Sequence, residues 1–331
     1  MNNSIQRNQL SIFNIFSTAR IYALISIICV HIYFANGIVS TLFNKVGSIG
    51  VITFLIMSGY FYRTNKFGSF KSMLKKKFNT VVIPWIVLGT LVWLYNFIQT
   101  KNTQNLLLGY INWIIGNSSY LYYLTVLFVC FLIFYKHNKT TLIIAIILNV
   151  LSIIMTEMGL LSNVLLVIRV SNYLNLFNWI GFFAFGILLQ DVNEEQIIAF
   201  LQKTRFIFII LFNLILTTLI IFPSVNVHYF TILAIPFEIL GTLAIMGLST
   251  FDLSKIKIFR VVSNYSFTIY LMHMVIIGTL DGLLAKYVIL TLLSPLLIIV
   301  ICYIVLWLVL FVSKKIKLEK LACLFLGVRN R

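Results

Sequence analysis

Charged residues are scarce in this sequence of 331 residues, and acidic residues are the scarcest. Asp, Glu, Lys and Arg together make up 10% of the chain, and only eight residues are acidic. Hydrophobic residues make up 61%, and the mean hydropathy is +1.03. A soluble globular domain carries about 25% charged residues. The composition therefore excludes such a domain and predicts an all-α polytopic membrane protein.

Cysteine is also rare and is not spaced as in metal sites. Three of the four cysteines, Cys29, Cys130 and Cys302, lie in apolar segments, and Cys323 lies in the basic C-terminal region. No pair has metal-ligand spacing, and the set does not suggest a disulfide framework. We therefore expect these cysteines to be packing residues and expect no metal cofactor.

The few charges are strongly biased toward one sign, with a net charge of +17. A basic excess can indicate nucleic-acid binding, but in a membrane protein it is better explained by the positive-inside rule. If both ends of the chain are cytoplasmic, 21 of the 25 Lys and Arg residues lie inside. The others are Lys45, Lys101, Arg169 and Lys286. This predicts an N-in/C-in topology and no nucleic-acid partner. The polar start predicts no cleaved signal peptide.

Apolar stretches separated by polar breaks predict about ten transmembrane helices within the bilayer, forming one domain over residues 1–331. A basic cytoplasmic tail, 313–331, follows the last span. The predicted spans are 18–38, 46–62, 80–98, 119–135, 140–156, 173–190, 206–222, 229–249, 264–281 and 287–312.

Arg20 and His31 are the clearest candidate functional residues, because both interrupt one apolar stretch. Eleven residues of α-helix make about 1100° of rotation, close to three full turns, so both side chains share one face. They are separated by about 16 Å along the axis, half of the ~30 Å hydrocarbon core. Arginine matches phosphate geometry, and a neutral histidine can act as a general base. The alternative is an interfacial anchor with a hydrogen-bonded interior histidine.

Other polar residues in the apolar stretches are weaker candidates. Ser58 and Gly59 close the second predicted span, and Arg63 follows Gly59 by four residues, on the same face of a helix. Small-residue packing and a positive-inside anchor explain these three equally well. His273 in the ninth span is either a satisfied core histidine or a catalytic group. Glu238 is the one carboxylate deep in a predicted span and could orient a histidine or stay protonated.

In sequence order, these motifs resemble the acyltransferase-3 family of integral membrane acyltransferases. The resemblance extends over about residues 12–312. The segments that carry it are Arg20 to His31, Ser58 to Arg63, the basic run before Ile83-Pro84, Tyr120 to Leu124, and Ser266 to His273.

The resemblance implies a function and assigns roles to the candidate residues. Members take an acyl group, usually acetyl from cytosolic acetyl-CoA, and deliver it to a hydroxyl of a glycan or another acceptor. By carry-over, His31 would be the catalytic histidine, and Arg20 and Arg63 would bind the CoA phosphates or organise the site. Tyr122 and Tyr123, in the aromatic segment of span 4, would line it.

The implied acceptor is a cell-envelope polysaccharide or its lipid-linked precursor, and the implied location is the cell (plasma or inner) membrane. Envelope-synthesis proteins would be further partners. The sequence departs from the family pattern at Ser17, where an acidic residue is frequent, and at Tyr122, where tryptophan is frequent. We also expect no fused extracytoplasmic hydrolase-like domain, so the chain completes the transfer itself or relies on a separate partner.

Two other functions fit the residue pattern. A transporter or flippase for a glycan or lipid-linked sugar would use the interior aromatic and polar side chains as a path, and would not depend on acetyl-CoA. A scaffold subunit of an envelope-synthesis complex would tolerate replacement of Arg20 and His31 as long as the helices insert and pack.

Overall fold

The computed structural model describes residues 10–100, 105–225 and 227–328. These residues form helices joined by short turns and contain no strand, which confirms the all-α prediction. Four residues counted in the charge argument, Arg7, Lys101, Arg329 and Arg331, lie outside the described residues.

Seven helical segments of the described chain are long and apolar enough to cross a membrane. They confirm a polytopic membrane protein. One of them, Phe70–Thr100, joins α3 (Phe70–Lys77) to α4 (Ile83–Thr100) through a π-helical turn at Phe78–Val82. The others are α1 (Ile12–Val30), α2 (Gly37–Tyr60), α7 (Lys139–Glu157), α10 (Glu194–Ile221), α12 (Lys257–Leu284) and α13 (Val288–Lys315).

The remaining three predicted spans coincide with shorter apolar helices, α6 (Tyr122–Ile133), α9 (Ile180–Leu188) and α11 (Ala234–Ser249). The 12 residues of α6 rise only about 18 Å, less than the ~30 Å of a hydrocarbon core. The count of ten spans and the N-in/C-in orientation therefore stay predictions. Three further short helices, α5 (Leu106–Ile115), α8 (Leu160–Val167) and α14 (Glu319–Leu326), connect or follow the spans.

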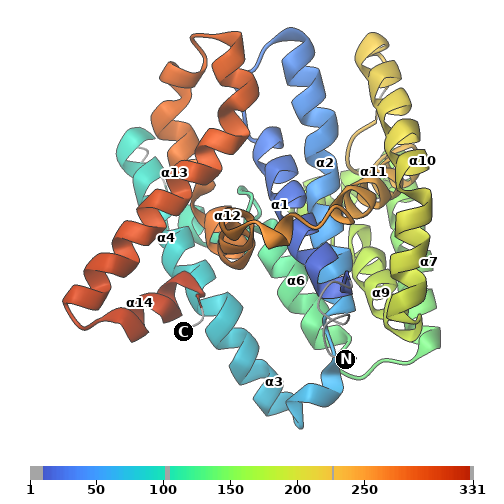
Figure 1. Cartoon of the computed structure of the whole chain (residues 1–331), viewed down its shortest axis with the longest axis horizontal. Helices are drawn as coiled ribbons and strands as arrows, with labels where there is room; N and C mark the ends of the chain where they lie inside the picture. Colours follow the sequence, from blue (N-terminus) through green and yellow to red (C-terminus); the bar gives the residue numbers. More distant parts are fainter. Residues whose placement is uncertain (1–9, 101–104, 226, 329–331) are drawn as a thin grey trace, which may run out of the picture.

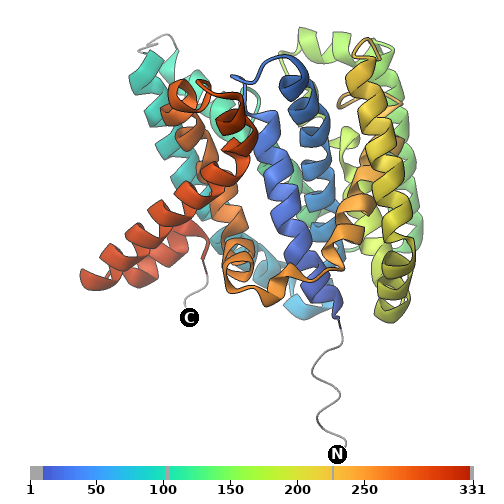
Figure 2. The same ribbon diagram turned by 45° about the horizontal axis from the view of Figure 1, so that its top comes forward.

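Helix α1 lies at the centre of the bundle (Figure 1). It packs against α2, α11 and α12, and it is the most buried of the seven long segments. On one side of it lie α4, α13 and α14, and on the other side lie α7, α9 and α10, as Figures 1 and 2 show. Because Arg20 is on α1 and His31 directly follows it, both candidate residues are held in the interior of the protein.

Glycines allow α2 and α9 to cross in close contact. A Cβ atom added to Gly59 would lie 2.1 Å from the carbonyl oxygen of Phe183, and one added to Gly186 would lie 2.1 Å from that of Ile56. No larger residue fits such a backbone-to-backbone approach, which is how small residues bring membrane helices together. The structure therefore gives Gly59 a packing role.

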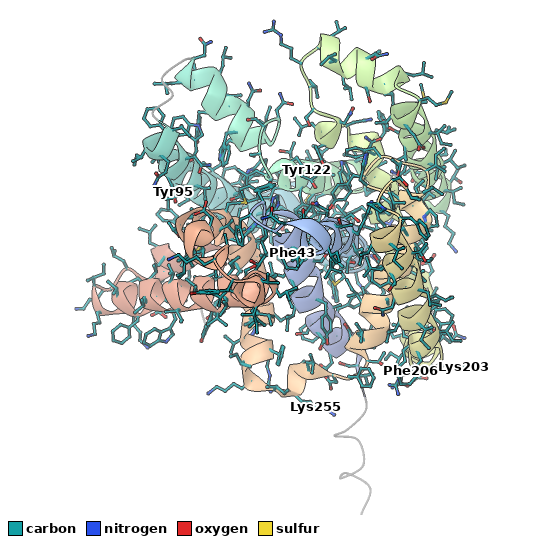
Figure 3. The ribbon with its side chains drawn as sticks, turned by 90° about the horizontal axis from the view of Figure 1, so that it is seen from above. Phe43, Tyr95, Tyr122, Lys203, Phe206 and Lys255 are labelled. Atoms are coloured by element: carbon teal, nitrogen blue, oxygen red, sulfur yellow. The ribbon has the colours of Figure 1, made fainter. Side chains whose placement is uncertain are left out.

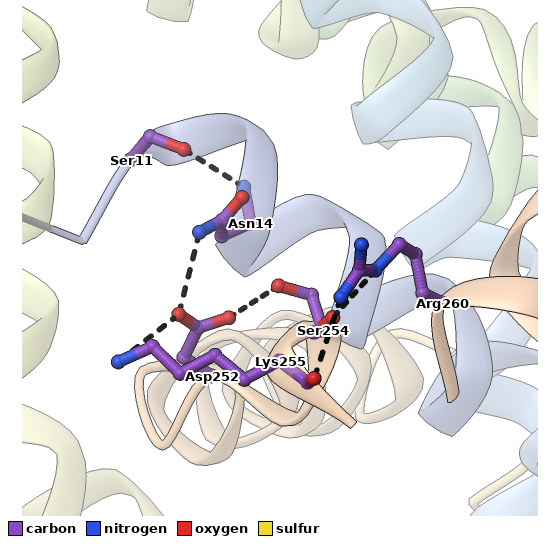
Figure 4. Close-up of polar contacts among 6 residues, drawn as sticks. All are labelled: Ser11, Asn14, Asp252, Ser254, Lys255 and Arg260. Atoms are coloured by element: carbon purple, nitrogen blue, oxygen red, sulfur yellow. Dashed lines mark hydrogen bonds and ion pairs between the residues drawn. The ribbon is translucent and has the colours of Figure 1, made fainter. Parts of the chain in front are cut away.

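A polar cluster ties the start of α1 to the turn before α12 (Figure 4). The buried Asp252 carboxylate accepts hydrogen bonds from the Asn14 amide, at 3.3 Å, and from the Ser254 hydroxyl. It also lies 3.7 Å from the Lys255 ammonium. One turn further along α1, the Ser17 hydroxyl donates to Ser263 on α12 at 2.9 Å. The cluster fixes α1 relative to α12, the helix that carries His273.

The first two spans end earlier than the sequence predicts. Helix α1 stops at Val30, not 38, so His31 caps the helix end and is not within a longer span. Helix α2 stops at Tyr60, and Arg63 follows in extended backbone, with φ −94° and ψ 103°. The prediction that Arg63 shares a helical face with Gly59 is therefore wrong, because the helix does not reach Arg63.

Candidate functional site

His31 lies at the C-terminal end of α1, where its side chain meets aromatic neighbours from three segments. Its Nδ1 atom is 3.1 Å from the Tyr33 hydroxyl. Its ring centroid is 5.2 Å from that of His273 and 6.0 Å from that of Tyr120. The side chain is partly exposed, so His31 is held in place by its neighbours and still reachable from a cavity.

His273 is completely buried beside His31. Its Nδ1 atom lies 2.5 Å from the Tyr270 carbonyl oxygen. A carbonyl can only accept a hydrogen bond, so Nδ1 carries the proton and Nε2 has a free lone pair. That Nε2 atom is buried and makes no hydrogen bond within the described part of the chain. His273 is thus held as one neutral tautomer next to the candidate catalytic histidine.

Two tyrosines hold the backbones of α6 and α12 together below this histidine pair. The Tyr120 hydroxyl donates to the Leu271 carbonyl, and the Tyr270 hydroxyl donates to the Tyr120 carbonyl, each at 2.6 Å. The reciprocal bonds bring the segment before α6 close to the middle of α12, where His273 lies. They explain why Tyr120 and His273, far apart in sequence, have ring centroids only 5.2 Å apart.

A cavity of about 530 Å³ opens next to His31, and we call it the His31 cavity. Its wall combines aromatic rings with neutral hydrogen-bonding groups, including Asn44, Asn117, Ser119 and Ser171. Six tyrosines also line it: Tyr33, Tyr120, Tyr122, Tyr173, Tyr229 and Tyr270. Hydroxyl and amide groups set among aromatic faces suit a neutral, polyhydroxylated ligand.

Tyr122 and Glu238, two of the secondary candidates, belong to one side of this cavity. Figure 3 shows Tyr122 near the centre of the molecule when seen from above. Tyr122 and Tyr229 both line the cavity, and the ring centroid of each lies 5.4 Å from that of Trp179. Glu238 is buried nearby on α11, close enough to both tyrosines to act on them electrostatically. Its Oε1 atom has no hydrogen-bond partner among the described residues. Glu238 does not line the cavity, so its contact with it passes through the tyrosines.

A second, smaller cavity of about 180 Å³ lies at Arg20, and we call it the Arg20 cavity. Ser58 of α2 and Lys77 at the end of α3 line it together with Arg20. The Lys77 ammonium lies 3.5 Å from the centre of the Phe131 ring, and the Arg20 guanidinium lies 5.5 Å from that of Phe61. Two cations therefore face one small cavity across aromatic rings, an arrangement that attracts an anionic group.

Arg63 does not line the Arg20 cavity. Its guanidinium lies 3.6 Å from the Glu194 carboxylate, and both side chains are well exposed. The cation that joins Arg20 is Lys77. The sequence places Lys77 in a basic run but does not distinguish it from its neighbours; in the structure it lies four residues after the buried Met73, on the inward face of α3.

Aromatic rings separate the two cavities. Tyr270 lines the His31 cavity, and its ring centroid is 5.6 Å from that of Tyr123. The Tyr123 ring centroid is in turn 6.4 Å from that of Phe54, which lines the Arg20 cavity. Tyr123 and Tyr270 therefore form a thin aromatic layer between the cation pair and the histidine pair. Along α1 the distance from Arg20 to His31 is about 16 Å.

A family model described as "Acyltransferase domain" matches residues 14–314 of the chain. The chain belongs to the acyltransferase-3 family. The match includes every candidate residue and nearly the whole bundle, so it confirms the resemblance found in the sequence. No curated protein and no solved structure gives a significant match to the chain.

Membership in the acyltransferase-3 family implies that the protein is a membrane acyltransferase. It does not support the transporter alternative. The structure brings Arg20 and Ser58 together at one cavity, and His31, His273 and Tyr122 at or beside the other. Sequence reasoning missed Lys77 and also Tyr229, because the turn that holds Tyr229 carries no periodic or spacing signal.

Proposed function

We propose that the protein moves an acetyl group from acetyl-CoA to a hydroxyl of a cell-envelope polysaccharide or its lipid-linked precursor. In this proposal the protein lies in the cell membrane, with the Arg20 cavity facing the cytosol. It completes the transfer itself or with an envelope-synthesis partner. The observation that carries the proposal is the position of His31, at the wall of a hydroxyl-rich cavity and one aromatic layer away from a pair of cations.

The Arg20 cavity is the donor side of this proposal. Acyl-CoA carries phosphates joined to a long, uncharged pantetheine arm that ends in the thioester. Arg20 and Lys77 suit a phosphate group, since arginine offers a fork of donors and lysine a compact charge. The cavity has room for one such group, and the nucleotide part of the donor lies in the solvent outside it, while the pantetheine arm extends inward. The thioester end then reaches toward Tyr123 and Tyr270.

The His31 cavity is the acceptor side. His31 removes the proton from the acceptor hydroxyl, and the oxygen attacks the thioester carbon. A C–O bond forms, the C–S bond breaks, and the proton passes to the departing CoA thiolate. The products are an acetyl ester and free CoA. In the alternative route, His31 takes the acetyl group first and transfers it to the hydroxyl in a second step. His273, fixed as a neutral tautomer, supports the positive charge on His31 in both routes.

The test uses the full-length protein in membrane vesicles with radiolabelled acetyl-CoA and envelope glycan as acceptor. We expect label in the glycan with the wild type and a loss of about 10²–10⁴-fold in kcat for His31→Ala, the range for a lost general base. The matched control is His137→Ala, because His137 lies in the turn before α7 and lines none of the cavities described. Transfer by His31→Ala at the wild-type rate would refute the role of His31.

The same system separates the two routes. Without acceptor, an acetyl-histidine intermediate leaves acid-labile label on the wild-type protein and none on His31→Ala. The general-base route leaves both proteins unlabelled and consumes acetyl-CoA only when glycan is present.

A further inference from the structure

A third cavity, of about 560 Å³, continues from the His31 cavity toward the turn before α11. We call it the Lys45 cavity. The two cavities share Val30, Asn44, Ser171, Tyr173 and Tyr229 in their walls, so they adjoin each other, and we call the pair the groove. Each part alone is as large as a site for one small molecule. The groove therefore extends well past the sugar whose hydroxyl would meet His31.

Among the described residues that line either cavity, Lys45 is the one cation apart from the histidines, and none is a carboxylate. Its ammonium donates a hydrogen bond to the Val227 carbonyl at 2.8 Å, which fixes its position. An ammonium has three donors, so two remain for a ligand. The ion pairs found in the described part of the chain do not include Lys45. A partly buried cation without a counterion attracts an anion.

Asn172 adds a second, independent sign of a ligand. It lines the Lys45 cavity, and its buried Oδ1 atom has no hydrogen-bond partner within residues 10–100, 105–225 and 227–328. Its amide nitrogen is already used, donating to the Ser162 hydroxyl at 3.2 Å. A buried acceptor without a donor is destabilising, and a sugar hydroxyl would supply the missing bond.

Aromatic rings complete the wall. Tyr173, Tyr229 and Phe230 line the Lys45 cavity, and their ring centroids lie 5.1 to 6.0 Å apart. Flat aromatic surfaces beside polar groups suit ligands that have both an apolar and a polar side, as a pyranose ring does.

From these three features we infer that the Lys45 cavity is a subsite for an anionic unit of the acceptor glycan. Lys45 binds the carboxylate or phosphate, Asn172 accepts a hydrogen bond from a ring hydroxyl, and the aromatic side chains pack against the sugar face. The inference rests on the proposed function and deepens it. The acceptor is then an acidic glycan whose charged unit lies near the sugar that is acetylated.

The test measures binding and transfer with two matched pairs of short oligosaccharides. One pair consists of a uronate-containing trisaccharide and its carboxyl-reduced form, and the other of a phosphorylated trisaccharide and its dephosphorylated form. The variants are Lys45→Gln, which keeps a hydrogen-bond donor for Val227, and Lys45→Arg, which keeps the charge. Lys286→Gln is the matched control, because Lys286 is exposed and lines neither cavity.

We expect the wild type to bind one charged trisaccharide at least about tenfold more tightly than its neutral form, the range for a hydrogen bond to a charged group. Lys45→Gln should abolish this preference, and Lys45→Arg and Lys286→Gln should retain it. The pair that shows the preference identifies the anion as a carboxylate or a phosphate. Equal binding of charged and neutral forms by the wild type, or an unchanged preference in Lys45→Gln, would overturn the inference.

Binding is measured in nanodiscs without acetyl-CoA, so it does not depend on catalysis. Failure of the proposed function would appear as charged-ligand binding without any acetyl transfer. Failure of the subsite would appear as acetyl transfer with no preference for the charged form.

Discussion

Replacement of Lys77 by glutamine tests the donor side of the proposed reaction most directly. Lys77 lies at the Arg20 cavity with its ammonium 3.5 Å from the centre of the Phe131 ring. If it binds a phosphate of acyl-CoA, the glutamine removes a charge-assisted hydrogen bond. Such a bond contributes about 1.5–3 kcal/mol, which corresponds to an increase in the KM for acetyl-CoA of roughly tenfold to 150-fold.

The structure also predicts which kinetic constant changes. Under the proposed function, Lys77 is near the phosphate end of the donor and not near His31, so it would contact substrate and transition state equally. Loss of such uniform binding raises KM and leaves kcat unchanged. The assay is acetyl transfer in nanodiscs over a range of acetyl-CoA concentrations at low salt, because salt screens the attraction.

The matched control is Lys75→Gln, since Lys75 is exposed on the same helix and lines none of the cavities described. Lys77→Arg should keep most of the affinity. An unchanged KM in Lys77→Gln, or an equal rise in Lys75→Gln, would refute the assignment, because a diffuse basic surface and not the cavity would then attract the donor.

Three further predictions concern the histidine pair and the packing around it. Introduced into the wild-type protein, His273→Gln should lower kcat by about tenfold. Introduced into His31→Ala, it should have no further effect, since His273 acts through His31. Additive losses of kcat in the double variant would contradict this. Gly59→Leu should lower the thermal unfolding midpoint of the protein in detergent by several degrees. The new Cβ would overlap a carbonyl of α9, and such overpacking costs about 1–3 kcal/mol. An unchanged midpoint would mean that α2 and α9 can move apart without loss of stability. Asp252→Ala should also lower the unfolding midpoint, because it removes buried hydrogen bonds worth about 1–3 kcal/mol. Asp252→Asn should keep part of these bonds. In thermal unfolding, the midpoint of Asp252→Asn should therefore lie between those of Asp252→Ala and the wild type.

The sequence predicts the class of fold and the identity of the central helix, since long apolar stretches leave little alternative to membrane helices. It does not predict where the helices end. Hydropathy continues through His31 to residue 38, but α1 stops at Val30, because the chain turns there to enter α2. The same limit applies to Arg63, whose place depends on α2 ending at Tyr60.

The sequence indicates candidate site residues where a charged or polar side chain interrupts an apolar stretch. Residue type and spacing select His31 and Arg20, and the family resemblance adds Tyr122; each of them lines a cavity, and their roles in the reaction stay predictions. Lys77 could not be selected, because it is one of four lysines in Lys71–Lys77 and the buried face of α3 is known only once the helix is packed. Residues of the groove such as Asn172 lie in irregular turns, where contacts across the fold determine their roles.

The aromatic layer of Tyr123 and Tyr270 has a consequence for the energy supply of the cell. A protein with polar cavities on either side of one thin partition is at risk of leaking protons and ions, which would dissipate the gradient across the membrane. The rings of Tyr123 and Tyr270, whose centroids are 5.6 Å apart, would have to block water and ions at this partition. Under the proposed function, an acetyl group would cross only as a covalently transferred unit, and the membrane would remain electrically insulated during each turnover.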